Sequence, residues 1–384
     1  MNAREFIVFA IGDPAKASTW SNVPYFLSKT LEEKGHVLHR ADLAPNRPMQ
    51  VAYDALIGAL RKTGITRTRH YFFRSSFNAW LTQRRIERVL RAHPKALPIF
   101  TTFSFGRNRQ RRPYVQFCDM TFERHLRYFE KRGPNAMEER TIARERKHIG
   151  GAALLVSLFP EQAEELKAQH GDRVRYYGNV VNTDIAAPDA QRLLHRDLSR
   201  PEVLFIGGSK YKPGLLKLLD VLETMNASRA LPIQLHAVGI PRHELLRAIP
   251  SWATVHGYLD KSDPEDAARY TGLLERCCLF INPMPLWGSF SASCEAMHMH
   301  MPVIVSAYPE FTSTFGKEPG VGILLRTEED AELSGAINNL LENPAEWRAS
   351  ARAAHETVNP FTWTNYVDRL LNDIGLLQPT GPTS

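Results

Sequence analysis

Short apolar runs alternate with amphipathic segments along most of the chain. The run at residues 5–11 indicates a strand, and residues 23–34 carry apolar side chains such as Phe26 and Leu31 at helical spacing. Residues 36–42 then indicate a second strand. A strand, a helix and a strand in this order predict a βαβ unit with parallel strands.

The rest of the first half continues this alternation with less regular spacing. Residues 75–92 predict a basic helix that contains Phe77 and Trp80. Its apolar stripe favours packing on a sheet, and the alternative is a helix that rests on anionic lipid with Trp80 at the interface. Further strands are predicted at residues 96–105, 113–119, 152–157 and 173–182, and further helices at residues 137–148 and 160–169.

The second half alternates more cleanly, which predicts a doubly wound parallel sheet whose ligands bind at the carboxyl ends of the strands. The polar, proline-containing stretch at residues 183–201 separates the two halves. We therefore expect one domain at residues 1–190 and a second at residues 191–359. Strands are predicted at residues 203–207, 233–239, 253–257, 278–283, 302–306 and 322–325, and helices from about residue 213 and at residues 264–276, 331–341, 344–356 and about 360–376.

Composition narrows the class of protein. A chain of 384 residues is long enough for two domains, and its 43% hydrophobic and 23% charged residues are typical of a soluble globular protein. No apolar stretch approaches the roughly 18 residues of a membrane-spanning helix. The apolar run at the N-terminus meets Asp13 and Pro14 at once, which favours a strand over a secretory signal. The four cysteines lack zinc-ligand spacing, so we expect a reduced, cytoplasmic protein.

Positive charge is concentrated in one part of the chain. Residues 61–150 contain 22 Lys and Arg against 7 Asp and Glu, whereas the remainder contains 26 against 34. This imbalance predicts an anionic partner for the first half. The partner could be the inner face of a membrane that carries anionic lipid, or a polyanionic glycan. It could also be nucleic acid bound through the arginine-rich segment at residues 106–112. No recognised nucleic-acid motif is present.

The stretch at residues 286–306 is the strongest candidate for a ligand site. An apolar run ends at the small residues Gly288 and Ser289, a short helix carrying Glu295 follows, and residues 302–306 predict a buried strand. Free backbone N–H groups and the helix dipole favour an anion at such a turn. Glu295 could then hold a hydroxyl of the molecule that carries the anion, which suggests a nucleotide-sugar diphosphate.

The order of the motifs resembles that of GT-B glycosyltransferases, in particular the family 4-like group also called glycosyl transferases group 1. The resemblance implies two Rossmann-like domains that face each other across a cleft, with the acceptor on the first, the nucleotide sugar on the second, and the last helix packed back on the first. The matching pieces cover almost the whole chain in order: TWSNVPYFLSKTLEEKGHVL, CDMTF, LLVSLFPEQAEEL, YYGNVVNTD, VLFIGGSKYKPGLLKLLDVL, IQLHAVG, VHGYL and GSFSASCEAMHMHMPVIVS.

The resemblance also implies roles for residues of the second half. Glu295 matches the glutamate that hydrogen-bonds the nucleotide ribose, and Lys212, with Lys210 beside it, matches the basic residues that neutralise the diphosphate. Tyr258 is placed near the base. Such a cation replaces the metal of other transferases, so neither a metal nor a cofactor is expected. The other residues implied in donor binding are Gly208, Ser209, Gly288, Ser289, Phe290 and Ser291.

The catalytic style stays open at this stage. The resemblance implies two glutamates separated by seven residues, and Trp287 stands at the position of the first, so both a retaining and an inverting reaction remain. An inverting reaction needs a general base, and Asp119 at a strand end is the best candidate, with a structural helix cap as the alternative. The loop after the first strand supplies the residues expected on the acceptor side: Gly12, Thr19, Trp20 and Ser21.

Together these observations predict a glycosyltransferase that acts on a nucleotide-diphosphate sugar and a glycan or lipid-linked acceptor, in cell-surface polysaccharide or glycolipid assembly. The alternatives are a GT-B-fold sugar-nucleotide epimerase and a non-catalytic protein that binds nucleic acid or glycan. We expect the protein in the cytoplasm, with peripheral attachment to the inner face of the membrane as an open question.

Overall fold

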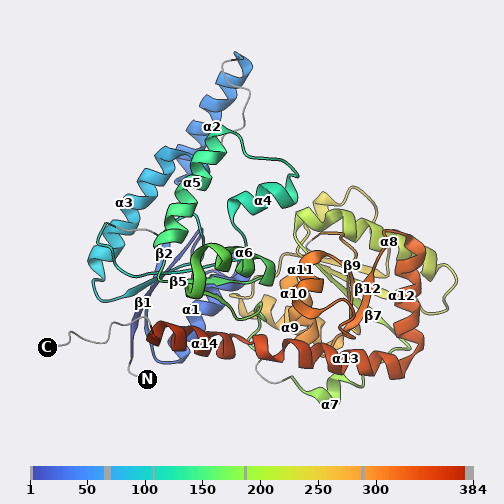
Figure 1. Ribbon diagram of the computed structural model, residues 1–384. Helices are drawn as coiled ribbons and strands as arrows, with labels where there is room; N and C mark the ends of the chain where they lie inside the picture. Colours follow the sequence, from blue (N-terminus) through green and yellow to red (C-terminus); the bar gives the residue numbers. More distant parts are fainter. Residues whose placement is uncertain (1–2, 65–70, 107–108, 186–187, 287–289, 377–384) are drawn as a thin grey trace. The chain divides into compact units, whose positions relative to one another are not determined.

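The computed structural model describes residues 3–64, 71–106, 109–185, 188–286 and 290–376 (Figure 1). The chain forms two compact units, one comprising Met1–Gly178 with Val367–Ser384 and the other comprising Asn179–Tyr366. Within the described residues, none of the helices is both long and apolar enough to cross a membrane.

The first unit is built on a six-stranded parallel sheet with the order β2-β1-β3-β4-β5-β6. Its central strands are buried along nearly their whole length, as parallel strands are when helices cover both faces of the sheet. The strands are β1 (Glu5–Ala10), β2 (Val37–Asp42), β3 (Leu97–Phe100), β4 (Val115–Cys118), β5 (Leu154–Ser157) and β6 (Val174–Tyr176).

The helices of the first unit differ in how far they are buried. Helix α1 buries most of its side chains, whereas α2 has no buried residue and extends away from the sheet in Figure 1. The helices are α1 (Val23–Glu33), α2 (Arg47–Lys62), α3 (Ser76–Ala92), α4 (Phe122–Phe129), α5 (Ala136–Gly151) and α6 (Pro160–His170), with the 3-10 turns η1 (Trp20–Asn22), η2 (Phe72–Arg74) and η3 (Gly171–Arg173).

The second unit contains another six-stranded parallel sheet, with the order β12-β11-β10-β7-β8-β9. Leu204, Ile281 and Ile304 are fully buried in its three central strands, and a large apolar cluster fills one face between the sheet and its helices. The strands are β7 (Glu202–Ile206), β8 (Gln234–Val238), β9 (Ala253–Gly257), β10 (Leu279–Asn282), β11 (Val303–Ser306) and β12 (Gly322–Leu325).

Helices of the second unit connect consecutive strands, as a doubly wound sheet requires. Helix α8 packs on β10, and α10 packs on α13. The helices are α7 (Ala190–Leu193), α8 (Lys212–Asn226), α9 (Pro264–Arg276), α10 (Phe290–His298), α11 (Pro309–Phe315), α12 (Asp330–Glu342) and α13 (Pro344–Val358), with the 3-10 turns η4 (Ser209–Tyr211), η5 (Arg242–Glu244) and η6 (Asn359–Phe361).

The last helix, α14 (Trp363–Leu376), returns to the first unit from Val367 onward. There Asp373 accepts hydrogen bonds from Arg175 and Tyr177, and Asp368 pairs with Lys34 at 2.7 Å. The prediction of two doubly wound α/β domains with a returning last helix is confirmed. The chain leaves the first unit at Gly178, earlier than the expected boundary at residue 190.

Candidate functional site

The strand order of the second sheet creates a switch point at its centre. Strands β7 and β10 lie side by side, and from there the chain order runs outward in opposite directions through β8 and β9 or through β11 and β12. In doubly wound sheets the loops on the two sides of such a switch point leave the carboxyl edge toward opposite faces of the sheet, and ligands typically bind between them. Both of the loops predicted to hold the donor leave this edge.

The loop after β7 depends on close backbone approach. Gly239, at the end of β8, has φ of +100°, and a Cβ there would lie 2.6 Å from the carbonyl oxygen of Gly207. A side chain on Gly207 would likewise collide with the ring of Tyr211. Gly208 and Ser209 follow in an exposed turn, where the Ser209 hydroxyl donates to Glu244 at 2.8 Å. Gly208 and Ser209 thus lie at the carboxyl edge, and their role in donor binding stays a prediction.

The two lysines of this loop carry positive charge toward the same edge. Lys210 is exposed, with its Nζ 4.7 Å from the centre of the Tyr211 ring, and Lys212 is half-buried at the start of α8. Neither lysine forms an ion pair with a described carboxylate. Both charges are therefore available to an anion.

The loop after β10 leads directly into α10. Trp287, Gly288 and Ser289 lie outside the described residues, whereas Phe290 and Ser291 are the first two residues of the helix. The Phe290 ring is buried against aromatic neighbours of α11, which fixes the start of α10. The positive end of a helix dipole favours an anion, and the start of α10 follows β10 at the carboxyl edge of the sheet.

Glu295 is buried on α10 with an exposed fraction of 2%. Its Oε2 accepts hydrogen bonds from Lys261 Nζ and from the Tyr270 hydroxyl, each at 2.5 Å. Lys261 also donates to the carbonyl of Asn182 at 2.9 Å. Among the described residues, none donates to Oε1, so this second oxygen can accept a hydroxyl of a ligand.

Lys261 and Tyr270 escaped the sequence analysis. Lys261 lies in a polar loop after β9, where a lysine normally indicates a solvated surface, and Tyr270 lies on α9. Contact with the Glu295 carboxylate and burial raise the pKa of Tyr270 well above its ordinary value, so the phenol stays a donor. These two side chains hold the carboxylate in one orientation.

Tyr258 follows β9 and is 53% exposed. Partial burial of the hydroxyl, with Asp260 and Asp266 nearby, raises its pKa to about 12. The Tyr258 phenol is also the smallest of the causes that raise the pKa of Tyr270. The ring of Tyr258 thus offers an exposed apolar surface directly after β9.

The carboxyl edge of the first sheet gathers the residues predicted on the acceptor side. Gly12 has φ of +112°, and a Cβ there would lie 3.0 Å from Thr19 Oγ1. Thr19 in turn donates to the Asp13 carbonyl at 2.6 Å. Trp20, Ser21 and Asn22 all have positive φ, which non-glycine residues seldom adopt.

Asp119 lies immediately after β4 and meets Trp20. Burial raises the pKa of the Asp119 carboxyl, and hydrogen bonds from the Cys118 thiol, at 3.3 Å, and from the Trp20 side chain partly oppose this. The structural alternative, a helix cap, does not apply, because Thr121 caps α4 by accepting the N–H of Arg124. A carboxylate with a raised pKa at a strand end is suited to accept a proton.

Two groups of side chains in the described part of the chain could hold a metal ion. They are Glu5 with His39 and His93, and Glu202 with His236 and Cys277. Glu5 and Glu202 are the first residues of β1 and β7, so both groups lie toward the amino ends of the strands, away from the edges that carry the predicted ligands.

Comparison with known proteins agrees with this geometry. Residues 200–343 match the family described as Glycosyl transferases group 1. The matched segment covers most of the domain formed by the second unit. This domain contains Lys210, Lys212, Tyr258 and Glu295. No curated protein matches the chain significantly.

Solved structures share the fold over the whole chain. Sucrose-phosphate synthase from Thermosynechococcus elongatus is 17% identical with a TM-score of 0.63, covering 98% of this chain and 100% of that protein. WaaG, a glycosyltransferase involved in lipopolysaccharide biosynthesis, is 12% identical with a TM-score of 0.63 and covers 98% and 100%. An epimerase from Listeria monocytogenes, described as a putative UDP-N-acetylglucosamine 2-epimerase, is 15% identical with a TM-score of 0.57 and covers 97% and 96%. The chain therefore has the GT-B fold.

Proposed function

We propose that this protein transfers a sugar from a nucleotide-diphosphate donor to an acceptor hydroxyl. The proposal rests mainly on the surroundings of Glu295. Lys261 and Tyr270 donate to Oε2 of this buried carboxylate, and Oε1 remains able to accept a ribose hydroxyl. Lys212 and the start of α10 lie at the same carboxyl edge and suit the diphosphate. The base would pack on Tyr258.

The chemistry follows from these charges. The bond between the sugar's anomeric carbon and the diphosphate oxygen breaks, and the leaving nucleoside diphosphate gains negative charge. Lys210 and Lys212 would stabilise that charge, so the residues present can act without a metal. The acceptor oxygen bonds to the anomeric carbon and loses its proton, which Asp119 would accept in an inverting reaction.

The acceptor side is proposed on the first unit. Gly12, Thr19, Trp20 and Ser21 lie on one loop beside Asp119, and Trp20 offers an aromatic face for a sugar ring. A glycan or lipid-linked acceptor in cell-surface polysaccharide or glycolipid assembly would suit this loop and the basic character of residues 61–150.

Thermal unfolding with UDP, GDP and dTDP tests the donor proposal. A ligand at 100 times its Kd stabilises the folded state by about 2.7 kcal/mol, so one of the three should raise Tm by several degrees. Glu295→Gln should remove this rise, whereas Glu332→Gln, a carboxylate on α12 bound by Thr327, should keep it. A wild-type protein that no nucleotide stabilises would contradict the proposal.

Turnover separates the proposed roles of Lys212 and Asp119. Lys212→Ala should lower kcat by about 100-fold through loss of charge stabilisation, and an unaffected rate would move the role to Lys210. Asp119→Asn should abolish an inverting reaction, and normal activity would exclude Asp119 as the base. NMR of the product's anomeric centre decides between inversion and retention.

A reaction without acceptor distinguishes a transferase from an epimerase. A transferase leaves the sugar nucleotide unchanged or hydrolyses it slowly, whereas an epimerase converts it to an isomer of equal mass. Mass spectrometry with chromatography distinguishes these outcomes. Salt-sensitive binding of generic RNA without any nucleotide response would instead favour a nucleic-acid-binding protein.

The exposed surface of α2 and α3 is proposed to contact anionic lipid. Met49, Val51 and Leu56 are exposed on α2, and Phe77 and Trp80 stack on α3 with ring centres 6.1 Å apart. Arg84 lies over the Trp80 ring at 3.9 Å. Apolar side chains among basic ones are typical of an interfacial surface.

Co-sedimentation with liposomes tests this surface. Binding is expected with vesicles that contain phosphatidylglycerol and should fall in 0.5 M salt and in a Val51→Asp variant. Equal binding to neutral vesicles, or none, would contradict a peripheral membrane role.

A further inference from the structure

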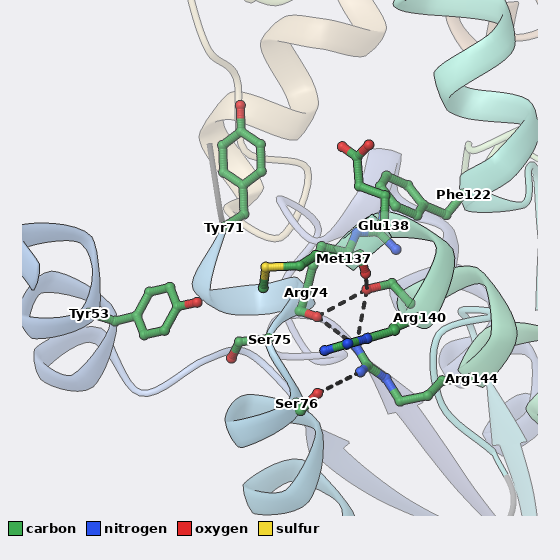
Figure 2. Close-up of a pocket in the computed structure, with 11 residues that line it drawn as sticks. Tyr53, Tyr71, Arg74, Ser75, Ser76, Phe122, Met137, Glu138, Arg140 and Arg144 are labelled. Atoms are coloured by element: carbon green, nitrogen blue, oxygen red, sulfur yellow. Dashed lines mark hydrogen bonds between the residues drawn. The ribbon is translucent and has the colours of Figure 1, made fainter. Parts of the chain in front are cut away.

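A small cavity opens in the first unit between η2, the start of α3, and the helices α4 and α5 (Figure 2). Its volume is about 50 Å³, whereas one water molecule needs roughly 10–15 Å³. Figure 2 shows Arg140 and Arg144 reaching toward it from α5, with the Tyr53 hydroxyl of α2 pointing toward them. Ser75 and Ser76 line the side formed by α3. The cavity thus combines cations, hydroxyl groups and an aromatic wall.

The two arginines on α5 lie one turn apart and are not neutralised. Arg144 donates to the Ser76 hydroxyl at 2.9 Å and to the Arg74 carbonyl at 2.6 Å, both uncharged acceptors. Neither Arg140 nor Arg144 forms an ion pair with a carboxylate of the described residues. Like charges at this spacing destabilise a helix unless an anion lies between them. On the same helix, Arg146 pairs with Glu123 at 2.7 Å.

A third arginine stands behind the cavity. The Arg74 guanidinium carbon lies 3.8 Å from the centre of the Phe122 ring, which also lines the cavity. Burial lowers the pKa of Arg74, and the nearby Glu145 only partly offsets this. Burial lowers the pKa of Arg144 as well. The carboxylate of Glu138 is taken by Arg132, so the cavity is short of negative charge.

The cavity also neighbours the proposed base. Phe122 begins α4 three residues after Asp119, and the charge of Arg74 interacts with Cys118, which precedes Asp119. Arg74 donates to the hydroxyl of Ser104, in the loop after β3 at the carboxyl edge of the sheet. A group held in the cavity would therefore lie beside the acceptor side of the first unit.

We infer that this cavity binds a phosphate group carried by the acceptor. The inference rests on the proposed transferase function and names its acceptor as a phosphorylated molecule. One guanidinium saturates the two oxygens of a carboxylate, whereas a phosphate monoester has three oxygens that Arg140, Arg144 and the α3 hydroxyls can share. The rings of Tyr53 and Tyr71 would contact the group that bears the phosphate.

Isothermal titration with glucose 6-phosphate, glycerol 3-phosphate, inorganic phosphate and glucose tests the inference. The two phosphate esters should bind, inorganic phosphate should bind more weakly, and glucose should not bind. The Arg140→Gln/Arg144→Gln variant should weaken the esters at least tenfold, and the matched control Arg146→Gln should change their affinity less than twofold. Equal affinity in the double variant and wild type would overturn the inference.

Two further measurements address poor folding of the double variant and a lipid source of the phosphate. Arg140→Gln alone removes an exposed side chain that forms no hydrogen bond or ion pair with the described residues. It should weaken the esters about threefold or more even if the double variant folds poorly. Vesicles containing phosphatidic acid distinguish a lipid phosphate from a soluble one. Vesicle binding that the Arg140→Gln/Arg144→Gln variant loses and Arg146→Gln keeps, with no binding of free esters, assigns the cavity to a lipid headgroup.

The donor experiment separates this inference from the proposed function. The double variant should keep the nucleotide-dependent rise in Tm, because Glu295 belongs to the second unit. A protein that responds to nucleotide but binds no phosphate ester would retain the transferase proposal and remove this acceptor. Loss of the nucleotide response in the wild type would remove the transferase proposal itself.

Discussion

Glu295 and Lys261 form a buried ion pair, with side chains exposed by 3% and 11%. Removing one partner of such a pair leaves an uncompensated charge, which typically costs about 3–5 kcal/mol. We expect Lys261→Met to lower the free energy of unfolding by about 3 kcal/mol, measured by urea denaturation. The double variant Lys261→Met/Glu295→Gln should recover part of the loss, and a double variant as unstable as the sum of the single ones would contradict the pairing.

His300 provides a second prediction at this scale. It is 6% exposed and stacks on His355, and burial is the main reason that its pKa is lowered to about 4. The unfolded chain takes up this proton near pH 6.5, so the stability due to neutral His300 is complete above pH 6.5 and is lost as the pH falls toward 4. The loss at pH 4.5 should be about 2 kcal/mol.

Urea denaturation at pH 7.5 and 4.5 checks this for wild type and His300→Asn. Asparagine tolerates the positive φ of 51° at this position, so the variant should fold and show a smaller loss at pH 4.5. His243→Asn, at an exposed site, should behave as wild type. Burial raises the pKa of Glu145 to about 7, so this group makes the protein more stable as the pH falls, opposite to His300. The difference between wild type and variant therefore isolates the effect of His300.

The sequence predicted Glu295 but not the residues that orient it. Glu295 follows a strand and a small-residue turn, a local pattern that marks its position. Lys261 precedes Glu295 by 34 residues in a loop with acidic neighbours, and only the folded β9–α9 connection brings its Nζ to the carboxylate. Trp20 and Asp119 were each predicted, and their contact again required the sheet to bring two loops together.

Helix α14 is the element that returns to the first unit, and two of its carboxylates make contacts of unequal strength. Asp373 is 17% exposed and accepts from Arg175 and Tyr177, whereas Asp368 is 48% exposed and pairs only with Lys34 among the described residues. We expect Asp373→Ala to lower the free energy of unfolding by about 2 kcal/mol, and Asp368→Ala by less than 1 kcal/mol.

Chemical denaturation of the two variants gives both values. The Tyr177 phenol, whose pKa is raised by burial and by Asp373, would lose its acceptor in Asp373→Ala. Equal effects of the two substitutions would mean that α14 is held by its apolar side chains alone.

Helix α2 shows why some elements escaped the sequence analysis. Its residues bury nothing, and among the described residues the next elements along the chain are η2 and α3 instead of a strand, so the alternation of strands and helices does not mark it. Helix α10 was predicted because it lies between two apolar strands and begins after small residues.

The whole molecule is a first unit interrupted by a second. The chain passes to the second unit after Gly178 and returns after Tyr366. Inside the second unit, Val181 and Thr362 form a parallel bridge, and Trp363 donates to Asn182 at 2.9 Å. The two ends of this unit are therefore joined within it.

We expect residues 179–366 to fold alone and to unfold in one cooperative transition. Nucleotide should stabilise this fragment as much as it stabilises the full chain. The fragment 179–358 should be less stable by about 3 kcal/mol or more, because it lacks the buried Trp363. Circular dichroism during heating, with and without nucleotide, checks both fragments. A longer fragment without a cooperative transition would show that this unit depends on the first.

At this scale the sequence was most informative. Alternating strands and helices predicted two parallel sheets, because each strand buried on both faces needs a continuous apolar run. The position of the boundary was less visible, since residues 179–182 are buried in the second unit although their sequence continues that of the preceding strand. The polar composition of residues 183–201 marked the exposed segment that follows the domain boundary, not the boundary itself.

The run of positive φ at Trp20, Ser21 and Asn22 has a consequence for how the protein could adapt. Each such residue costs on the order of 1–3 kcal/mol, and glycine would remove much of that strain. Selection for heat resistance would therefore favour glycine at Ser21 or Asn22, at the expense of a loop whose shape sets the position of Trp20 beside Asp119. Relatives from hot habitats should therefore have glycine at these positions more often than relatives from temperate habitats. A more stable loop would come with slower catalysis.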